Sequence, residues 1–382
     1  DVNASGSTYV AYLFAHDTSS TGIIQCGSFT TDGSGNATVN LGWEPQYLML
    51  KASSTAQDWY VYDVMRGFGN PVDVVLRPNT NAAEQNLNPT SSSYLSPTAT
   101  GFQAVGGWLA ASTTYIYMAI RRPNKPPTSG TQVFSPVART GTGATATVSL
   151  TNLPDLLIGA NRASAYPFTY DRLRGVNRLN QALGTYSSDS EAGIGAPANT
   201  VTALNNVSYV VGTDGSGFSV NNAGVSLVSW NFTRAPGFFD EVCYTGMGGT
   251  LNPSHNLGVI PELKIIKSRS SAFFWVVGGS IVTGGTQNDY IALNDAAAKV
   301  SSSTYWSSGA DTSTTFSTRG SNAASNEMGQ TYVAYLFATL AGISKVGSYT
   351  GNGTGQAIAC GFSAGARFVL IKRTDSTGDW YT

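Results

Sequence analysis

Two Asp–Arg pairs with the same internal spacing are the side chains best suited to chemistry. Asp63 is followed three residues later by Arg66, and Asp171 is followed three residues later by Arg174, each arginine preceding a glycine. Such a pair can bind a sugar hydroxyl or another subunit. It can equally hold a loop against the fold, with the glycine at a positive-φ turn. The corresponding stretch 277–279 has no such pair, so the fold does not depend on it.

Aromatic residues just before the first pair form a second candidate site. In an extended strand Trp59, Val61 and Asp63 share one face, and Tyr60 and Tyr62 share the other. A tryptophan returns at this register further along the chain. This is typical of a core position, with stacking on a sugar as the alternative. Tyr60 and Tyr62 are then predicted to be exposed. The predicted binding residues are Tyr60, Tyr62, Asp63, Arg66, Asp171 and Arg174.

The sequence offers little for catalysis or for metal binding. No pair of carboxylates recurs along the chain, whereas a glycosidase needs two at a defined separation. Two histidines and the widely spaced Cys26, Cys243 and Cys360 give neither a zinc pattern nor a disulfide framework. We therefore expect no catalytic residue, no metal and no cofactor.

Composition narrows the class of partner. The formal net charge is −1 and only 11% of the residues are charged, so nothing draws the chain to nucleic acid or acidic lipid. No run reaches the ~20 apolar residues of a membrane helix. We expect neither nucleic acid nor a membrane as a partner. Uncharged polar side chains dominate the hydrophilic part, as is common in extracellular and virion proteins.

A recurring strand must position these groups. Residues 8–15 read Thr-Tyr-Val-Ala-Tyr-Leu-Phe-Ala and return unchanged at 331–338, with looser copies at 115–120 and 227–232. Alternation places three large apolar residues on one face of each copy. We expect this face to be buried over a core, so that truncating Phe232 or Phe337 to alanine costs ~3–5 kcal/mol. The members of the face are Val10, Tyr12 and Phe14; Ile116, Met118 and Ile120; Val228, Trp230 and Phe232; and Val333, Tyr335 and Phe337.

Further spacings indicate a whole-domain repeat of roughly 108 residues, too long for a solenoid unit. A lysine is followed eight residues later by a tryptophan at Lys51 and Trp59, Lys267 and Trp275, and Lys372 and Trp380. Many short strands with Gly, Asn and Ser turns favour an all-β fold of tandem antiparallel β-sandwiches, jelly-roll or concanavalin-like.

The repeat predicts five segments along the chain. Residues 1–21 hold the closing strand of a preceding unit. Units one to three occupy 22–125, 126–236 and 237–340, and a truncated fourth occupies 341–382. Segments 22–121, 132–234 and 239–339 are expected to superpose. An unpaired strand at 8–15 would expose backbone donors and an apolar face. We expect it to pair with an upstream part of a longer chain or, less favoured, with a neighbouring chain.

The unit resembles an uncharacterised tandem repeat domain of structural proteins of tailed phages, especially marine ones. The resemblance rests on Gly-Ser-Tyr-Thr-Gly-Asn-Gly at 347–353, Phe-Val-Leu-Ile-Lys-Arg-Thr at 368–374, Asp-Trp at 379–380 and the closing strand 331–338. It is specific in the first and fourth units, weaker in the third and poor in the second. It implies a virion component with a lectin-like β-sandwich and brings no catalytic residues.

These observations support three functions in order. The first is a non-enzymatic virion structural protein, a tail fibre or tail-associated protein, whose loops contact host-surface glycans. The second is a decoration protein that cements a capsid or an extracellular filament. The third is a glycan-degrading enzyme. The expected partners of the first are other virion proteins, further copies of the chain and host-surface glycans.

Overall fold

The computed structural model describes residues 3–19, 21–69, 72–86, 93–163, 167–176, 183–191, 200–213, 220–283, 288–306, 311–320 and 322–382. The chain is all-β, as predicted, and every strand pairing is antiparallel. In the described part, no helix is long and apolar enough to cross a membrane. Among the described residues, the helical elements are a 3₁₀ turn at Gly130–Gln132 and one short helix, α1 (Ser280–Thr283).

Repeat 1, residues 22–125, is a sandwich of two sheets. The larger sheet has the order β1-β10-β3-β4, the second has the order β2-β9-β8, and three short strands form a small third sheet. The strands are β1 (Ile24–Thr30), β2 (Ala37–Asn40), β3 (Pro45–Ala52), β4 (Trp59–Asp63), β5 (Phe68–Gly69), β6 (Val72–Val75), β7 (Gln85–Asn86), β8 (Tyr94–Thr98), β9 (Gly101–Val105) and β10 (Thr114–Arg121).

Repeat 2, residues 126–236, has the same order of strands in its larger sheet, β11-β18-β13-β14-β15, and a second sheet β12-β17-β16. Its strands are β11 (Phe134–Thr140), β12 (Ala146–Ser149), β13 (Leu156–Asn161), β14 (Phe168–Asp171), β15 (Leu183–Gly184), β16 (Val201–Leu204), β17 (Ser208–Val211) and β18 (Ser226–Phe232).

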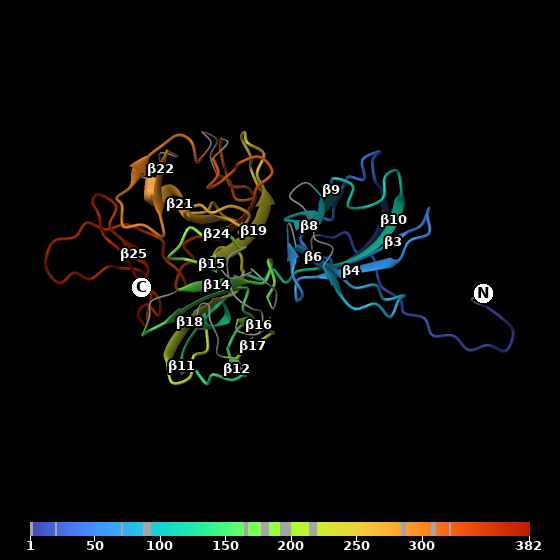
Figure 1. Ribbon diagram of the computed structural model, residues 1–382, viewed down its shortest axis with the longest axis horizontal. Helices are drawn as coiled ribbons and strands as arrows, with labels where there is room; N and C mark the ends of the chain where they lie inside the picture. Colours follow the sequence, from blue (N-terminus) through green and yellow to red (C-terminus); the bar gives the residue numbers. More distant parts are fainter. Residues whose placement is uncertain are drawn as a thin grey trace.

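Repeat 3, residues 237–340, continues the order in a larger sheet β19-β24-β20-β21-β22-β23. Its strands are β19 (Phe239–Thr245), β20 (Leu263–Ser268), β21 (Val276–Gly278), β22 (Asp289–Ala292), β23 (Val300–Ser301) and β24 (Thr331–Phe337). A hairpin of β25 (Ile371–Lys372) and β26 (Trp380–Tyr381) follows in 341–382, which we call the C-terminal unit. Figure 1 shows repeat 1 as a body beside the one that repeats 2 and 3 form together.

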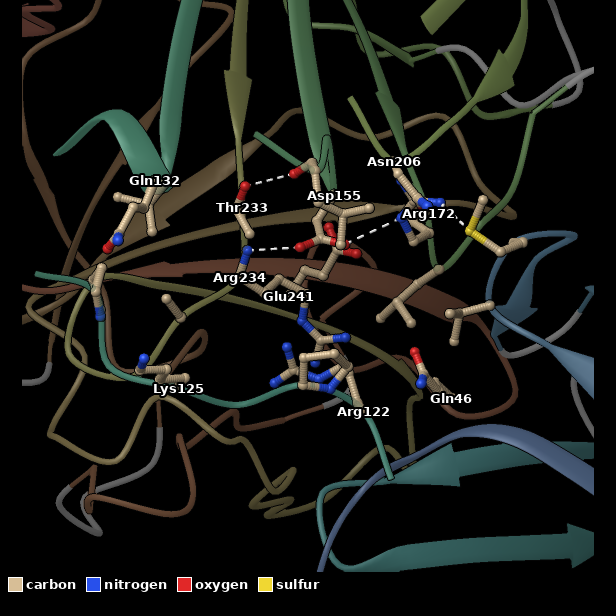
Figure 2. A pocket seen from close by; sticks show the side chains of 18 of the residues that line it. Gln46, Arg122, Lys125, Gln132, Asp155, Arg172, Asn206, Thr233, Arg234 and Glu241 are labelled. Carbon is tan, nitrogen blue, oxygen red and sulfur yellow. Dashed lines mark hydrogen bonds and ion pairs between the residues drawn. The ribbon is translucent and has the colours of Figure 1, made fainter. Parts of the chain in front are cut away.

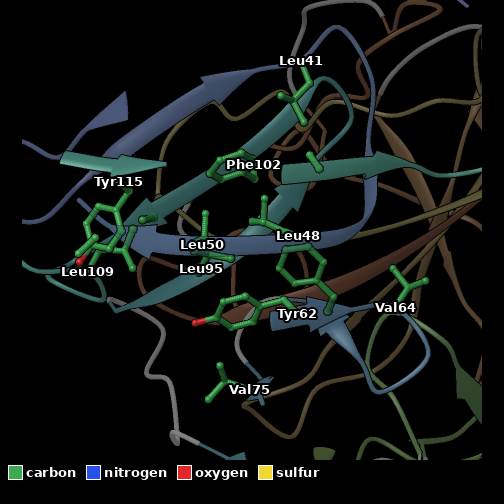
Figure 3. Packing of buried hydrophobic residues seen from close by; sticks show 14 of the residues in the cluster. Leu41, Leu48, Leu50, Tyr62, Val64, Val75, Leu95, Phe102, Leu109 and Tyr115 are labelled. Atoms are coloured by element: carbon green, nitrogen blue, oxygen red, sulfur yellow. The ribbon is translucent and has the colours of Figure 1, made fainter. Parts of the chain in front are cut away.

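The recurring apolar face does not line the sandwich interiors, which corrects the sequence prediction. In repeat 1 the interior is lined by Tyr115, Tyr117 and Ala119 of β10, which pack with Leu48, Leu50 and Phe102 (Figure 3). The predicted face of β10 points outward, and Ile116 is 43% exposed. In repeat 3 the interior likewise holds Tyr332, Ala334 and Leu336. The alternation was read correctly, but the face was assigned to the wrong side of the sheet.

In repeats 2 and 3 the same outer face is buried, because the two larger sheets pack against each other. Phe232 of β18 meets Phe239 and Phe337 of repeat 3, with ring centroids 6.0 and 5.8 Å apart. Val333 and Tyr335 are buried in this cluster. The recurring apolar face is therefore a contact between repeats, which repeat 1 does not share.

The prediction that residues 8–15 form a buried, paired strand is wrong for this structure. The segment has no strand, and Val10 and Tyr12 are 80% and 83% exposed. The tail joins repeat 1 only after it, where the backbone N–H of Asp17 donates to the carbonyl of Ile24 at 2.9 Å. Figure 1 shows the tail pointing away from the folded body.

Candidate functional site

Three repeats meet at a buried cluster of charges, here called the junction cluster. It comprises Glu44 of repeat 1, Arg122, Arg234, Asp240 and Asn256. Arg234 donates from both terminal nitrogens to the two carboxylate oxygens of Glu44, each at 2.8 Å. Its Nε donates to Asp240 at 2.7 Å, and the Asn256 amide donates to Glu44 at 2.8 Å. The guanidinium of Arg122 lies 3.3 Å from Glu44. A residue of repeat 1 is thus fixed by residues from both neighbouring repeats.

The charges in this cluster stabilise one another away from water. Burial alone would raise the pKa of the Asp240 carboxyl, but Arg234, Arg122 and the backbone N–H of Asn256 outweigh burial and lower it. Burial works to lower the pKa of Arg234, and the carboxylates of Asp240 and Glu44 instead raise it well above its usual value. Both groups are therefore ionised at neutral pH, and removing one partner would leave an uncompensated buried charge.

A cavity of about 340 Å³ borders the junction cluster (Figure 2). Its polar lining includes Arg122, Lys125, Asp155, Arg172 and Glu241. Asp155 is already engaged, because it accepts from Arg172 Nε at 3.2 Å and from the backbone N–H of Arg234 at 2.7 Å. The cavity is at the small end of the range for ligand pockets.

Glu241 is the unusual group of this lining. It is fully buried, and neither carboxyl oxygen has a hydrogen-bond partner among the described residues. Burial, followed by the nearby Asp171 carboxylate, raises the pKa of Glu241 well above its usual value. Its surroundings therefore favour the protonated carboxyl, and a protonated carboxyl can donate a hydrogen bond or a proton.

The predicted pair Asp171 and Arg174 lies between repeats 2 and 3, with both side chains fully buried. Asp171 accepts from the Arg174 side chain and from the Tyr335 hydroxyl of repeat 3, the latter at 2.6 Å. Arg174 also donates to Glu191 at 3.1 Å, and Glu191 accepts from Arg269 of repeat 3 at 2.8 Å. In this structure the pair binds the neighbouring repeat.

The equivalent pair in repeat 1 is not enclosed, although Met65, which lies between its two members, contacts Arg172 of repeat 2 with 2.9 Å from Sδ to the guanidinium. Arg66 donates to Asp63 at 2.6 Å and to the carbonyl of Val61 at 3.0 Å, and its guanidinium lies 3.4 Å from Glu84. The side chains of Arg66 and Asp63 remain 19% and 21% exposed. The Asp63–Arg66 and Asp171–Arg174 pairs therefore share their internal geometry, but only the second pair is fully buried.

The predicted exposure of Tyr62 is wrong, and that of Tyr60 holds only in part. Tyr62 is buried, stacks on Phe68 and accepts a hydrogen bond from the Trp108 indole at 3.3 Å. Tyr60 is half-buried against the same core. Trp59 and Val61 are half-buried on the outer face. This is the same reversal of faces as in β10.

The lysine and tryptophan that recur eight residues apart bind the preceding repeat. In repeat 3 the Trp275 indole donates to the carbonyl of Gly184 at 2.9 Å, and Lys267 Nζ donates to the carbonyl of Ser188 at 3.1 Å. The backbone N–H of Glu191 completes the contact by donating to the carbonyl of Arg269 at 2.9 Å. We call these three hydrogen bonds the docking contact.

The docking contact occurs again between the C-terminal unit and repeat 3, at equivalent positions. The Trp380 indole donates to the carbonyl of Ala292 at 2.9 Å, and Lys372 Nζ donates to the carbonyl of Ala296 at 2.8 Å. The backbone N–H of Lys299 donates to the carbonyl of Thr374 at 2.9 Å. The carbonyls that accept from the tryptophan and the lysine are four residues apart in both cases, at 184 and 188 in repeat 2 and at 292 and 296 in repeat 3.

Sequence reasoning missed the junction cluster and the acceptors of the docking contact. The eight-residue spacing of lysine and tryptophan was visible, but the tryptophan was assigned to a core. The segments 122–127 and 234–237 contain proline and lie at the joins between repeats, and their arginines were the available signal in the sequence. Within the described residues, no group of acidic, histidine or cysteine side chains could hold a metal ion.

A family model described as a domain of unknown function, DUF7483, matches residues 1–123 and 129–382. The chain belongs to the DUF7483 family. The two matched DUF7483 segments are separated at 124–128, within the connection between repeats 1 and 2. No curated protein matches the chain.

Proposed function

We propose that this DUF7483 protein is a non-enzymatic structural component, whose repeats dock on one another to form a rigid row of β-sandwiches. The observation that carries the proposal is the docking contact, which occurs twice with the same hydrogen bonds. The residues that recur along the chain serve this contact, whereas a catalytic set would be expected to recur as polar groups around a cleft.

The proposed setting is an extracellular particle, a phage virion, with the chain as part of a tail fibre or tail-associated structure. Support comes from the resemblance of 347–380 to repeats of tailed-phage structural proteins and from the low charge content. A decoration protein of a capsid or filament is the alternative that uses the same architecture. Host-surface glycans are the proposed ligand of the exposed loops, with other virion proteins as neighbours.

Glu241 supports the one enzymatic alternative. A buried, protonated carboxyl beside a cavity is what a general acid in a glycan-degrading enzyme requires. Its neighbour Asp155, however, is held by Arg172 and by the backbone of Arg234, and a base with both oxygens so engaged is poorly placed to activate water. We therefore place this function behind the structural one.

The test is to incubate the full chain with a panel of bacterial surface polysaccharides and measure new reducing ends. Purified virions from the source of the sequence are searched for the chain by mass spectrometry in parallel. The proposal predicts no release and the presence of the chain in the particles. Release that a Glu241→Gln variant abolishes, or absence from the particles, would overturn it.

A further inference from the structure

Repeat 1 carries both halves of the docking contact, and no other part of the chain that the structure describes uses either half. Its lysine and tryptophan are Lys51 and Trp59, which face each other across β3 and β4. Lys51 Nζ donates to the carbonyls of Ala52 and Gln57 at 3.0 and 2.7 Å, which leaves one of its three donors. Within the described residues, the Trp59 indole nitrogen has no hydrogen-bond partner.

The acceptor half of repeat 1 is identified by register. Phe168 pairs with Gly184 in repeat 2, and Val276 pairs with Ala292 in repeat 3. The bridge between Val61 and Leu76 places Arg77 at this position in repeat 1.

Two hydrogen bonds confirm this alignment. The backbone N–H of Trp59 donates to Asn79, as that of Trp275 donates to Asn294, both at 2.9 Å. The carbonyl of Arg77 accepts from the Thr80 N–H at 3.1 Å, as that of Gly184 accepts from Ser187 at 3.3 Å.

The acceptor carbonyls of repeat 1 are therefore those of Arg77 and, four residues on, Asn81. Residues 78–84 are exposed, so a partner can reach both carbonyls. The carbonyl of Gly184 accepts the Trp275 indole while it also accepts its turn hydrogen bond. The carbonyl of Arg77 also accepts from the Thr80 hydroxyl at 3.2 Å. That exposed hydroxyl can rotate toward water, which leaves the second lone pair of the carbonyl to a partner's indole.

Repeat 2 does not use this acceptor because it lacks the donors. Ala160 occupies the position of Lys51 and Lys267. Each of the three pairs with the equivalent residue of the neighbouring strand in its own repeat. Pro167 stands at the position of the tryptophan. Repeat 1 is held instead through Glu44 and the junction cluster. Among the described residues, nothing engages its donor or its acceptor.

We propose that copies of this chain associate head to tail through repeat 1. Lys51 and Trp59 of one copy donate to the carbonyls of Asn81 and Arg77 of the next copy. The occupant is a second copy because the described residues leave both complementary halves open on one repeat, which cannot dock on itself. A contact between two different patches generates an open row or a ring rather than a closed two-fold dimer.

The lysine and the tryptophan are sufficient to form the docking contact, as the C-terminal unit shows. The contact between repeats 2 and 3 adds Tyr335 and Arg269, which grip Asp171 and Glu191. The C-terminal unit has Thr374 in place of Arg269, and it still makes all three hydrogen bonds of the docking contact. Repeat 1 has Ser53 at that position and keeps the lysine and the tryptophan.

This inference deepens the proposed structural role by naming the partner, and it rests on that role. The experiment is sedimentation velocity of the full chain at increasing concentration. We expect wild type to associate and Trp59→Phe, which removes only the indole N–H, to weaken association by roughly tenfold. Trp59→Ala is expected to abolish it, with circular dichroism showing that the variant is folded. The matched control is Trp108→Phe, which removes an indole N–H that donates to Tyr62 inside repeat 1, and it should associate like wild type.

A mixing experiment tests the head-to-tail direction. Ala82→Trp places a bulky ring at the exposed residue next to the Asn81 carbonyl and should also give a monomer. A mixture of Trp59→Ala and Ala82→Trp combines one intact donor with one intact acceptor, so it should form dimers and nothing longer.

Wild type that stays monomeric up to about 1 mM, or Trp59 variants that associate unchanged, would overturn the inference. So would an equal loss in Trp108→Phe, or a mixture that forms no dimers. Such a result would leave the absence of glycan hydrolysis intact, so the two proposals fail separately.

Discussion

Repeat 1 and repeats 2 and 3 build the same sheet and use its outer face differently. In repeats 2 and 3 the two outer faces cover each other, and Val333 is completely buried, whereas Ile116 at the equivalent position of repeat 1 is 43% exposed. The Asp171–Arg174 pair is covered in the same way, and Asp63–Arg66 is open. Equivalent residues thus acquire different energetic roles from their neighbours.

The largest difference is expected at the docking tryptophans. Trp275→Ala removes a buried ring and its hydrogen bond to Gly184, and we expect a loss of about 4–6 kcal/mol in the free energy of unfolding. Trp59→Ala at the half-buried equivalent should cost about 1–2 kcal/mol. Urea unfolding followed by circular dichroism measures both. Equal losses would show that the tryptophans belong to their own sandwiches rather than to the contact.

The arginines of the two pairs give the next difference. Arg174→Ala leaves the buried Asp171 without its cation, while Glu191 keeps Arg269, and the loss should cost about 3–5 kcal/mol. Arg66→Ala acts at a partly exposed pair and should cost about 1 kcal/mol or less. The same urea measurement applies, and added salt should reduce only the smaller effect. A larger loss in the Arg66 variant would contradict the assignment of the covered pair.

Lys267 should make stability rise in alkaline solution. Burial lowers its pKa to about 8, below its ordinary 10.5, so the unfolded chain binds more protons between these values. Stability from this group therefore increases as the pH rises from 8 to 10.5, by up to about 3 kcal/mol. The difference in unfolding free energy between wild type and Lys267→Met, followed across this range, isolates the group. A flat difference would show that Lys267 is not buried by repeat 2.

Glu241 should make the free energy of unfolding fall as the pH rises, which is the opposite of the effect of Lys267. The pKa of Glu241 is raised in the folded protein, so its stabilising contribution is complete below the unfolded pKa and is lost as the pH rises above it. Glu241→Gln cannot ionise, and the variant should gain on wild type between pH 4 and pH 7. Thermal unfolding at these two values tests the sign. A variant that loses on wild type over this interval would show that the carboxyl is ionised in the fold.

The all-β class and the antiparallel sheets could be predicted because strand alternation and turn composition are local properties. The inner face of the sheet could not, because β24 is apolar on both sides: Tyr332, Ala334 and Leu336 face one core and Val333 and Tyr335 face another. Alternation then separates the two faces of the strand but does not show which face points into the sandwich interior.

The candidate site was predictable only to the extent that its residues recur. The Asp–Arg pairs and the lysine–tryptophan spacing were visible, but a sequence does not show which copy a neighbour covers. Glu44 and Arg234 lie 190 residues apart and have no counterpart pairing in the other repeats. Their contact depends on how three repeats meet, and this is decided by tertiary packing.

The central claim is that the recurring outer face is a contact between repeats, closed in repeat 3 and open in repeat 1. Its most direct test is maleimide labelling of Ile116→Cys and Val333→Cys, in a background without the native cysteines and at low protein concentration. The account predicts that the cysteine at 116 is labelled at a rate close to that of an unfolded control and that the cysteine at 333 is protected until the protein unfolds. Equal protection of both cysteines, or rapid labelling at 333, would contradict it.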